Sequence, residues 1–404
     1  MFWLIMWMGL GLVNSACRSS PKAFPKRVVV VMTWAGRAMS LEERPADTPA
    51  VSLPSSRSTL PGVAFVRSLT LFGGVLWSLS VAVSIGLVLD GMGGKVSRCG
   101  NMRLERRDMI QAGYVFNGFV TEDLDVGDAV IHVRHGGQGP AVLLLHGHPR
   151  TGATWHKVAP LLVAAGFSVV CPDLRGYGAS NGPEPTSDHS AHSKRAVAND
   201  MAKVMTMLGH DRFHLVGHDR GSYVAFRLAL DHGQRVERLT LIDCVPISEH
   251  LARADARFAT RWWHWFFFAQ PDIPERVINA DPDAWYGADP EVMGIENYAE
   301  WREAIHNPRV VRAMLEDYRA GLTIDRADES ADKAAGRQLD MPVLALWSLQ
   351  DDLEDLYGDP LTIWRDWATD VRGHGIDSRH HVAEEAPHEL ATAIIRFIDT
   401  SLTD

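Results

Sequence analysis

Asp219 lies at the centre of a five-residue stretch, Gly217 to Gly221, that joins a strand-like run to a helix-like run. The preceding residues, 213–216, are suited to a buried strand, and residues 223–230 have the composition of a helix. Glycines on both sides let the backbone turn sharply, so the pattern is typical of a nucleophile elbow. A carboxylate is ionised at neutral pH and can displace a leaving group from an alkyl carbon to give an ester. The stretch predicts hydrolysis of a carbon–halogen bond or of an epoxide; a turn with an incidental aspartate is the alternative.

An alkyl ester on Asp219 would persist unless a base activated water, and histidine is the usual base at neutral pH. Among the 18 histidines, His380 is the best placed, because it follows a strand-like segment and precedes the last helix-like segment. The adjacent His381 is the alternative. We therefore predict that His380 activates the water that hydrolyses the ester.

A third group must orient that imidazole and stabilise its charged form. Asp243 ends an apolar strand-like run, and a carboxylate buried there would require a partner. Asp351 and Asp352 follow another strand-like run and are the alternatives, although they also open an acidic stretch that could be a solvated loop. The sequence favours Asp243 and leaves Asp351 open.

Short apolar runs alternate with amphipathic stretches from about residue 113 onward. The runs at residues 141–145, 238–242 and 341–347 have the composition of buried strands. Strands that alternate with helices predict a mostly parallel sheet covered on both faces, with a site at the carboxyl ends of the strands. Between residues 246 and 339 the alternation stops, and aromatic residues recur at helical spacing. Because so long a structureless loop is improbable in a compact domain, we predict an inserted helical cap.

The beginning of the chain differs from the rest. Residues 68–89 carry no charge and are long enough to span a bilayer. With the positive residues that follow, a genuine span would leave the C-terminal part in the cytoplasm. The alternative is that translation begins later, at Met92, Met102 or Met109. The predicted organisation is a non-catalytic N-terminal extension, residues 1–108; a core in two parts, residues 109–245 and 340–404; and a cap, residues 246–339.

The composition excludes some classes of partner. The 404 residues carry a net charge of −10, so the composition gives no sign of the basic surface that binds nucleic acid.

Cys171 and Cys244 end strand-like runs and fit buried, reduced thiols of a cytoplasmic protein. No cluster has metal-ligand spacing, and the mechanism needs no cofactor, so we predict neither metal nor cofactor.

Further motifs accompany the elbow in a fixed order. They are the segments His146–Pro149, Asp173–Gly178, His264-Trp265, Ala269–Pro271 and Glu316–Gly321, and His380 before Glu384–Pro387. With these motifs, residues 116–398 resemble the α/β-hydrolase superfamily, and within it the haloacetate (fluoroacetate) dehalogenases and their epoxide hydrolase relatives. The series is specific for the family and less specific for the substrate.

The resemblance implies an α/β-hydrolase fold with Asp219 as nucleophile, His380 as base and Asp243 as the acid that orients it. It also implies an oxyanion hole built from the backbone N–H groups of His148 and Arg220. The side chain of His148 stands where relatives usually carry an aromatic residue, and it is either a wall of the site or a proton-transfer group.

The resemblance further implies that His264, Trp265 and Tyr318 of the cap donate hydrogen bonds to a departing halide. An aromatic cap helix packed inward would explain the same residues without any such role. In the epoxide hydrolase relatives a tyrosine protonates the epoxide oxygen, so Tyr318 could do this here. A second tyrosine beside it, Tyr286 or Tyr298, would favour the epoxide reaction.

Recognition of a substrate carboxylate needs fixed cations. Arg220 matches one arginine of the pair in the family, but Tyr223 stands where the second belongs. Arg150, directly after Pro149, is an additional cation that could replace it, and a solvated surface arginine is the alternative.

These features predict an enzyme that works through an aspartyl ester, first a dehalogenase of short 2-haloacids such as haloacetate and second a diol-forming epoxide hydrolase. A non-catalytic binding protein on the same fold is the third hypothesis. The partner is a small-molecule substrate, and a membrane is a partner only if residues 68–89 form a span. Whether the chain forms a homodimer stays open.

Overall fold

The computed structural model describes residues 116–399. The predicted extension and its possible span, residues 68–89, lie outside the described residues. The described residues belong to one compact unit. Among residues 116–399, no helix combines the length and the apolar character that a membrane span requires.

An eight-stranded sheet organises this unit, with strand order β1-β2-β4-β3-β5-β6-β7-β8. The strands β1 and β2, and β2 and β4, pair antiparallel, whereas every pairing from β4 to β8 is parallel. The mostly parallel sheet predicted from the sequence is confirmed. The strands are β1 (Val120–Asp125), β2 (Val130–Gly137), β3 (Ala141–Leu145), β4 (Ser168–Pro172), β5 (Phe213–His218), β6 (Val236–Ile242), β7 (Val343–Ser348) and β8 (Val371–Ile376).

Helices cover both faces of the sheet, and the alternation of side chains along β3 shows how. Leu143 and Leu145 belong to one apolar cluster, while Val142 and Leu144 belong to another on the opposite face. The continuous apolar composition of this strand follows from burial on both sides. The core helices are η1 (Gly152–Lys157), α2 (Ala159–Ala164), η2 (Ser190–His192), α3 (Lys194–Met207), α4 (Arg220–Asp231), η3 (Gly233–Arg235), α14 (Leu353–Tyr357), α15 (Leu361–Trp364), α16 (Val382–Glu385) and α17 (Pro387–Ile398).

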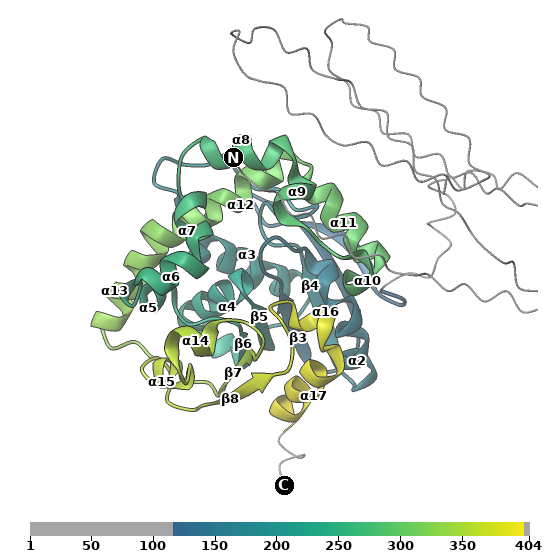
Figure 1. Cartoon of the computed structure of the whole chain (residues 1–404). Helices are drawn as coiled ribbons and strands as arrows, with labels where there is room; N and C mark the ends of the chain where they lie inside the picture. Colours follow the sequence, from purple (N-terminus) through teal and green to yellow (C-terminus); the bar gives the residue numbers. More distant parts are fainter. Residues whose placement is uncertain (1–115, 400–404) are drawn as a thin grey trace, which may run out of the picture. The chain divides into compact units, whose positions relative to one another are not determined.

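The chain between β6 and β7 is helical. Figure 1 shows α7, α11 and α12 of this segment on the side of the molecule opposite α17. The sequence predicts a helical cap at residues 246–339, and we use the name cap for the helices between β6 and β7. Its helices are α5 (Ile247–Ala252), α6 (Ala256–Arg261), α7 (Trp263–Phe268), α8 (Ile273–Ala280), α9 (Pro282–Tyr286), α10 (Pro290–Met293), α11 (Ile295–Ile305), α12 (Pro308–Ala320), the π-helical turn η4 (Gly321–Asp325) and α13 (Arg326–Ala334).

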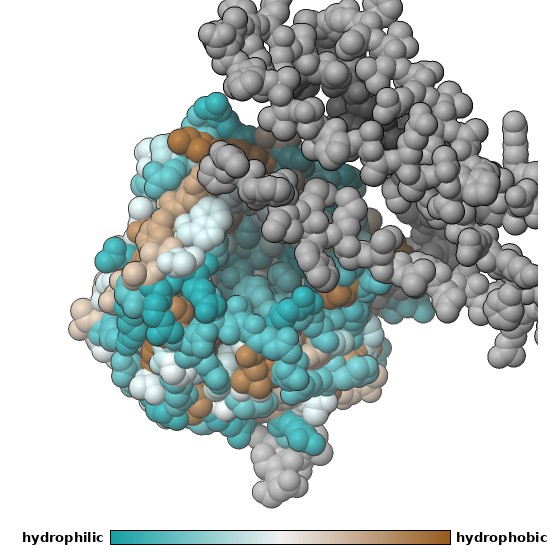
Figure 2. Space-filling view, viewed as in Figure 1, coloured by the Kyte–Doolittle hydropathy of each residue, from teal (hydrophilic) through white to brown (hydrophobic). Residues whose placement is uncertain are grey.

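Large aromatic side chains join the cap to the core. Trp265 and Trp301 of the cap are each 1% exposed and belong to the same apolar cluster as Tyr223 on α4. The visible face is mainly hydrophilic with scattered apolar groups, as Figure 2 shows. Both described cysteines, Cys171 and Cys244, are free thiols and buried, as predicted.

Candidate active site

Asp219 occupies the turn between β5 and α4 in a backbone conformation that few residues adopt. Its φ is 50° and its ψ is −119°. Glycines on both sides are required by space, because a Cβ on Gly217 would lie 2.5 Å from the carbonyl oxygen of Gly221, and a Cβ on Gly221 would lie 2.4 Å from that of His146. Such strain persists only where the surrounding structure imposes it, and it holds the carboxylate above the end of β5.

The loop after β3 brings a backbone donor to this carboxylate. The N–H of His148 donates to Oδ1 of Asp219 at 2.7 Å. This approach needs a glycine at position 147, where a Cβ would lie 2.5 Å from that same oxygen. Burial raises the pKa of Asp219, but His380, His218, Arg220 and the backbone N–H of Arg220 outweigh it and bring the pKa below its usual value. The carboxylate is therefore ionised at neutral pH.

His380 faces Asp219 from the loop after β8. Its Nε2 lies 3.8 Å from Oδ2 of Asp219, the oxygen that the loop after β3 leaves free. The neighbouring His381 forms no ion pair with these carboxylates in the part of the chain described. The structure thus brings together two groups that are 161 positions apart in the sequence, with the imidazole on the side where an ester oxygen would form.

The acid hydrogen-bonded to His380 is not the one that the sequence favours as its orienting acid. Oδ2 of Asp351 lies 2.9 Å from Nδ1 of His380 in a hydrogen bond, whereas Oδ2 of Asp243 lies 3.5 Å from the same nitrogen. The two oxygens of Asp243 accept hydrogen bonds from the N–H and the hydroxyl of Ser348, at 2.7 and 2.5 Å. The hydrogen bond to Nδ1 of His380 therefore comes from Asp351, the alternative that the sequence left open, and Asp243 is a second carboxylate near the same nitrogen. Asp352 instead accepts from the indole N–H of Trp262 in the cap.

Three carboxylates control the ionisation of His380. Partial burial lowers its pKa, but the hydrogen bond to Asp351 and the charges of Asp219 and Asp243 raise the pKa to about 10. The same hydrogen bond holds the pKa of Asp351 below its usual value, although burial raises it. At neutral pH the imidazole is therefore protonated while Asp219 is ionised.

The three cap residues predicted to bind a leaving group lie near one another, and the charge of Asp219 acts on two of them, His264 and Tyr318. Tyr318 lies against His264 and Trp265, with ring centroids 5.9 and 6.2 Å apart. Within residues 116–399, none of their polar side-chain atoms has a hydrogen-bond partner. Burial lowers the pKa of His264 to about 4 despite the charge of Asp219, and burial with that charge raises the pKa of Tyr318. All three are neutral donors at neutral pH.

Arg220 is fully buried and already holds a counter-ion. Its Nε and Nη2 donate to the side chain and the carbonyl oxygen of Asp317, at 2.5 and 2.7 Å. Its guanidinium stacks over Tyr318 at 4.1 Å, and Nη1 is buried without a partner among the described residues. One edge of the guanidinium therefore stays available to an anion or a carbonyl oxygen, although Asp317 compensates its charge.

Tyr223 stands where the family has a second arginine, and it begins a chain of hydrogen bonds between uncharged side chains. The hydroxyl of Tyr223 lies 3.1 Å from Nε2 of His250, whose Nδ1 lies 2.6 Å from the hydroxyl of Tyr357. Burial together with the charge of Arg220 lowers the pKa of His250 to about 3, so this imidazole is neutral. In the described part of the chain, the side chains hydrogen-bonded to Tyr223 and His250 are uncharged, so none of them supplies the charge of a second arginine.

Arg150 does not replace it either, and this prediction is corrected. Arg150 is 5% exposed, and its Nε and Nη2 donate to the two carboxylate oxygens of Glu384 at 2.9 and 3.2 Å. Thr154 and Asn297 donate to the same carboxylate, so it links the core to cap helix α11. The guanidinium is a structural partner of a buried acid.

The sequence named Tyr286 only as an alternative to Tyr298, and it left the side chain of His148 open between a wall of the site and a proton-transfer group. The hydroxyl of Tyr286 is buried without a partner among the described residues, and so are both ring nitrogens of His148. These two rings lie 5.5 Å apart. The aromatic composition of residues 262–286 was the available signal, but it could not show which tyrosine lies beside Tyr318.

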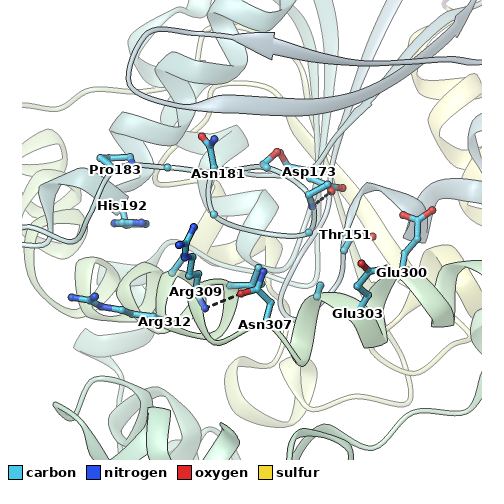
Figure 3. Close-up of a pocket in the computed structure, with 18 of the residues that line it drawn as sticks. Thr151, Asp173, Asn181, Pro183, His192, Glu300, Glu303, Asn307, Arg309 and Arg312 are labelled. Carbon is cyan, nitrogen blue, oxygen red and sulfur yellow. Dashed lines mark hydrogen bonds between the residues drawn. The ribbon is translucent and has the colours of Figure 1, made fainter.

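A cleft of about 560 Å³ lies elsewhere, between the loop after β4 and helices α11 and α12 (Figure 3). Asn181, His192, Asn307 and Arg309 are among its lining residues, whereas Asp219 is not.

The atoms of His218, Asp243 and His380 that could bind a metal ion lie within 4.8 Å of one another. Nε2 of His218 is already 2.7 Å from the carbonyl oxygen of His380, so this group is organised by internal contacts.

Residues 140–361 match the family described as alpha/beta hydrolase fold. The chain belongs to the α/β-hydrolase family. It is similar to the fluoroacetate dehalogenase of Burkholderia sp, with 37% identity over 298 residues that cover 70% of this chain and 95% of the relative. It is also similar to the soluble epoxide hydrolase of Corynebacterium sp. (strain C12), with 32% identity over 66% of this chain and 93% of the relative.

Solved structures agree with this assignment. An α/β hydrolase structure from Nostoc sp PCC 7120 shares 41% identity at a TM-score of 0.68, covering 70% of this chain and 99% of the other. The epoxide hydrolase CorEH, at 26% identity and a TM-score of 0.60, covers 69% and 98%. The α/β-hydrolase fold inferred from the sequence is confirmed, and both dehalogenases and epoxide hydrolases are among the relatives.

Proposed function

We propose that this α/β hydrolase removes halide from short 2-haloacids through an ester on Asp219. Oδ2 of Asp219 attacks the carbon that carries the halogen, the carbon–halogen bond breaks, and the halide leaves with the bonding electrons. The observation that carries the proposal is the set of free, neutral donors on His264, Trp265 and Tyr318 above an ionised Asp219. A halide in a water-excluded site needs such donors.

Hydrolysis of the ester then uses the core side of the site. Water adds to Cγ of Asp219, His380 takes its proton, and the negative charge develops on Oδ1, where the N–H of His148 already donates. The Cγ–Oδ2 bond breaks, and His380 returns the proton to the departing alkoxide. The product is a 2-hydroxyacid that carries the former Oδ2, while the oxygen of water stays in Asp219.

Ester formation also prepares the base. Before the reaction the pKa of His380 is raised to about 10, in part by the charge of Asp219. An ester removes that charge, so the pKa of His380 falls, the imidazolium releases its proton to solvent, and the neutral imidazole can then take a proton from the attacking water. The imidazole is thus kept protonated during attack and becomes a base afterwards.

An epoxide hydrolase is the second candidate, and Tyr286 is the observation that favours it. The rings of Tyr286 and Tyr318 both lie against His148, with centroid distances of 5.5 and 5.2 Å. Two tyrosine hydroxyls on one wall could share protonation of an epoxide oxygen.

The two functions separate in one assay. Purified protein is incubated with chloroacetate, fluoroacetate and styrene oxide, and halide and diol are quantified. Release of halide with glycolate formation supports the dehalogenase. Diol formation without halide release selects the epoxide hydrolase, and neither product contradicts the aspartyl-ester proposal.

A further inference from the structure

The imidazole of His148 is the most unusual polar group in the wall of the site. The residue is 9% exposed, and both ring nitrogens are buried without a hydrogen-bond partner among residues 116–399. A buried polar group without a partner is unfavourable, and native proteins rarely keep one without a use. Here a single side chain carries two such atoms next to the nucleophile.

Aromatic rings surround this imidazole on several sides. Its centroid lies 5.4 Å from that of Phe268, 5.5 Å from Tyr286 and 5.2 Å from Tyr318. Burial lowers its pKa to about 3, although the charge of Asp219 opposes this, so the ring is neutral. A neutral imidazole offers one N–H donor and one acceptor nitrogen.

Tyr286 presents a matching group from the cap. Its hydroxyl oxygen is buried and without a partner among the described residues, and burial raises its pKa. Tyr286 ends α9 of the cap, while His148 follows β3 of the core. Two uncharged groups, one from each part of the molecule, therefore lie with their ring centroids 5.5 Å apart and with their hydrogen bonds unmade.

The charges elsewhere in the site limit the kinds of chemical group that His148 and Tyr286 could bind. The cations nearest to Asp219 are largely paired: Arg220 is held by Asp317 and keeps only Nη1 without a partner, and His380 is held by Asp351. The carboxylate of the 2-haloacid itself would take the free Nη1 of Arg220, so a second carboxylate or a phosphate beside His148 and Tyr286 would have neither of these cations left to pair with and would lie near the charge of Asp219. A hydroxyl group can both donate to and accept from an imidazole and a phenol, so it would satisfy both.

We propose that His148 and Tyr286 form a subsite for an uncharged hydroxyl substituent of the substrate. The inference rests on the proposed function and narrows its substrate class to 2-haloacids that carry a hydroxyl on the adjacent carbon. His148 thus has two roles, with its backbone N–H directed at Asp219 and its ring determining specificity.

The test compares two substrates that differ by one group. 2-Chloro-3-hydroxypropanoate and 2-chlorobutanoate share the leaving group and the carboxylate, and a hydroxyl in the first replaces a methyl in the second. We expect kcat/KM to be at least about 10 times higher for the hydroxylated acid than for 2-chlorobutanoate. The methyl group of 2-chlorobutanoate would leave the buried polar atoms of His148 and Tyr286 without hydrogen bonds. His148→Phe and Tyr286→Phe should each lower this ratio about 10-fold. Tyr298→Phe, the same change on cap helix α11, is the matched control and should leave the ratio unchanged.

Two outcomes overturn the subsite. In the first, the wild type shows no preference for the hydroxylated acid. In the second, His148→Phe and Tyr286→Phe lower kcat/KM equally for both acids, which is the result expected if the two side chains only pack in the wall of the site. Calorimetry with the halogen-free acids 3-hydroxypropanoate and butanoate tests the same preference without chemistry. If neither chlorinated acid releases chloride, the proposed dehalogenation fails. Equal affinity for the two halogen-free acids then rejects the subsite as well, and tighter binding of 3-hydroxypropanoate supports it.

Discussion

The core side and the cap side of this site are built from opposite kinds of group. On the core side, Asp219, His380 and Asp351 are ionised and paired with one another. On the cap side, His264, Trp265 and Tyr318 are neutral, and their polar atoms have no partner among residues 116–399. The proposed function assigns different tasks to the two sides: the ions at the strand ends make and break the ester, and the free cap donors receive the leaving group.

Changing His380 gives the largest effect that this division predicts. His380→Gln should abolish turnover, by about 10³-fold or more, because no base remains to hydrolyse the ester. Halide should still appear in an amount equal to the enzyme and then stop. Rapid-quench measurement of halide and intact mass spectrometry check this. Multiple turnovers at an undiminished rate would show that the core side does not supply the base.

The two acids behind His380 should differ in effect. Asp351→Asn should lower kcat by about 10²- to 10⁴-fold, since the group bonded to Nδ1 is lost. Asp243→Asn should lower kcat by about 10-fold, since its direct contacts are with Ser348. Steady-state kinetics of both variants decide the assignment. The reverse order would restore Asp243 as the orienting acid.

The same pair predicts a dependence of stability on pH. The pKa of His380 is raised in the folded state, so the stabilisation by Asp351 is fully present below about pH 6.5 and is lost as pH rises through about 10. The difference in free energy of unfolding between wild type and Asp351→Asn should therefore shrink from pH 6 to pH 10. Urea denaturation at pH 6, 8 and 10 measures it. A difference that grew with pH would contradict a protonated His380.

A change on the cap side should be smaller and should depend on the leaving group. Tyr318→Phe should lower kcat/KM by about 10- to 100-fold for fluoroacetate and by less for bromoacetate, because fluoride accepts stronger hydrogen bonds. Equal losses for both would indicate packing alone. Tyr298→Phe is the control for the loss of a hydroxyl from a cap helix.

Arg150 lies outside the site, so changing it should alter stability without altering substrate binding. Arg150→Met should leave the KM for haloacids unchanged but lower the free energy of unfolding by about 3 kcal/mol, because Glu384 would stay buried without its cation. Arg365→Met removes an exposed pair with Asp359 and should change stability by less than about 1 kcal/mol. Thermal and urea unfolding compare the two. A raised KM in Arg150→Met would return this residue to substrate binding.

The sequence predicted the parts of the site that local patterns determine. The glycines around Asp219 follow from a turn too tight for any Cβ, and the motifs around His380 and Tyr318 were readable in order. The choice between Asp243 and Asp351 was not readable. A buried carboxylate after β6 does require a partner, but the structure supplies Ser348 from β7.

Long-range pairing explains the other differences. Arg150 and Glu384 are 234 positions apart, and no local pattern indicates that their side chains meet. The contact between His148 and Tyr286 depends in the same way on how the cap sits on the core. The sequence could name these residue types but not their partners.

The nucleophilic role of Asp219 is tested most directly by a single turnover in heavy-oxygen water. With enzyme in excess over 2-chloropropanoate, the mechanism predicts that one oxygen from the solvent enters the side chain of Asp219 and that the 2-hydroxyacid carries an unlabelled oxygen. Peptide mass spectrometry locates the label. If the label appeared in the hydroxyacid and never in Asp219, water would attack the substrate directly and the account would be contradicted.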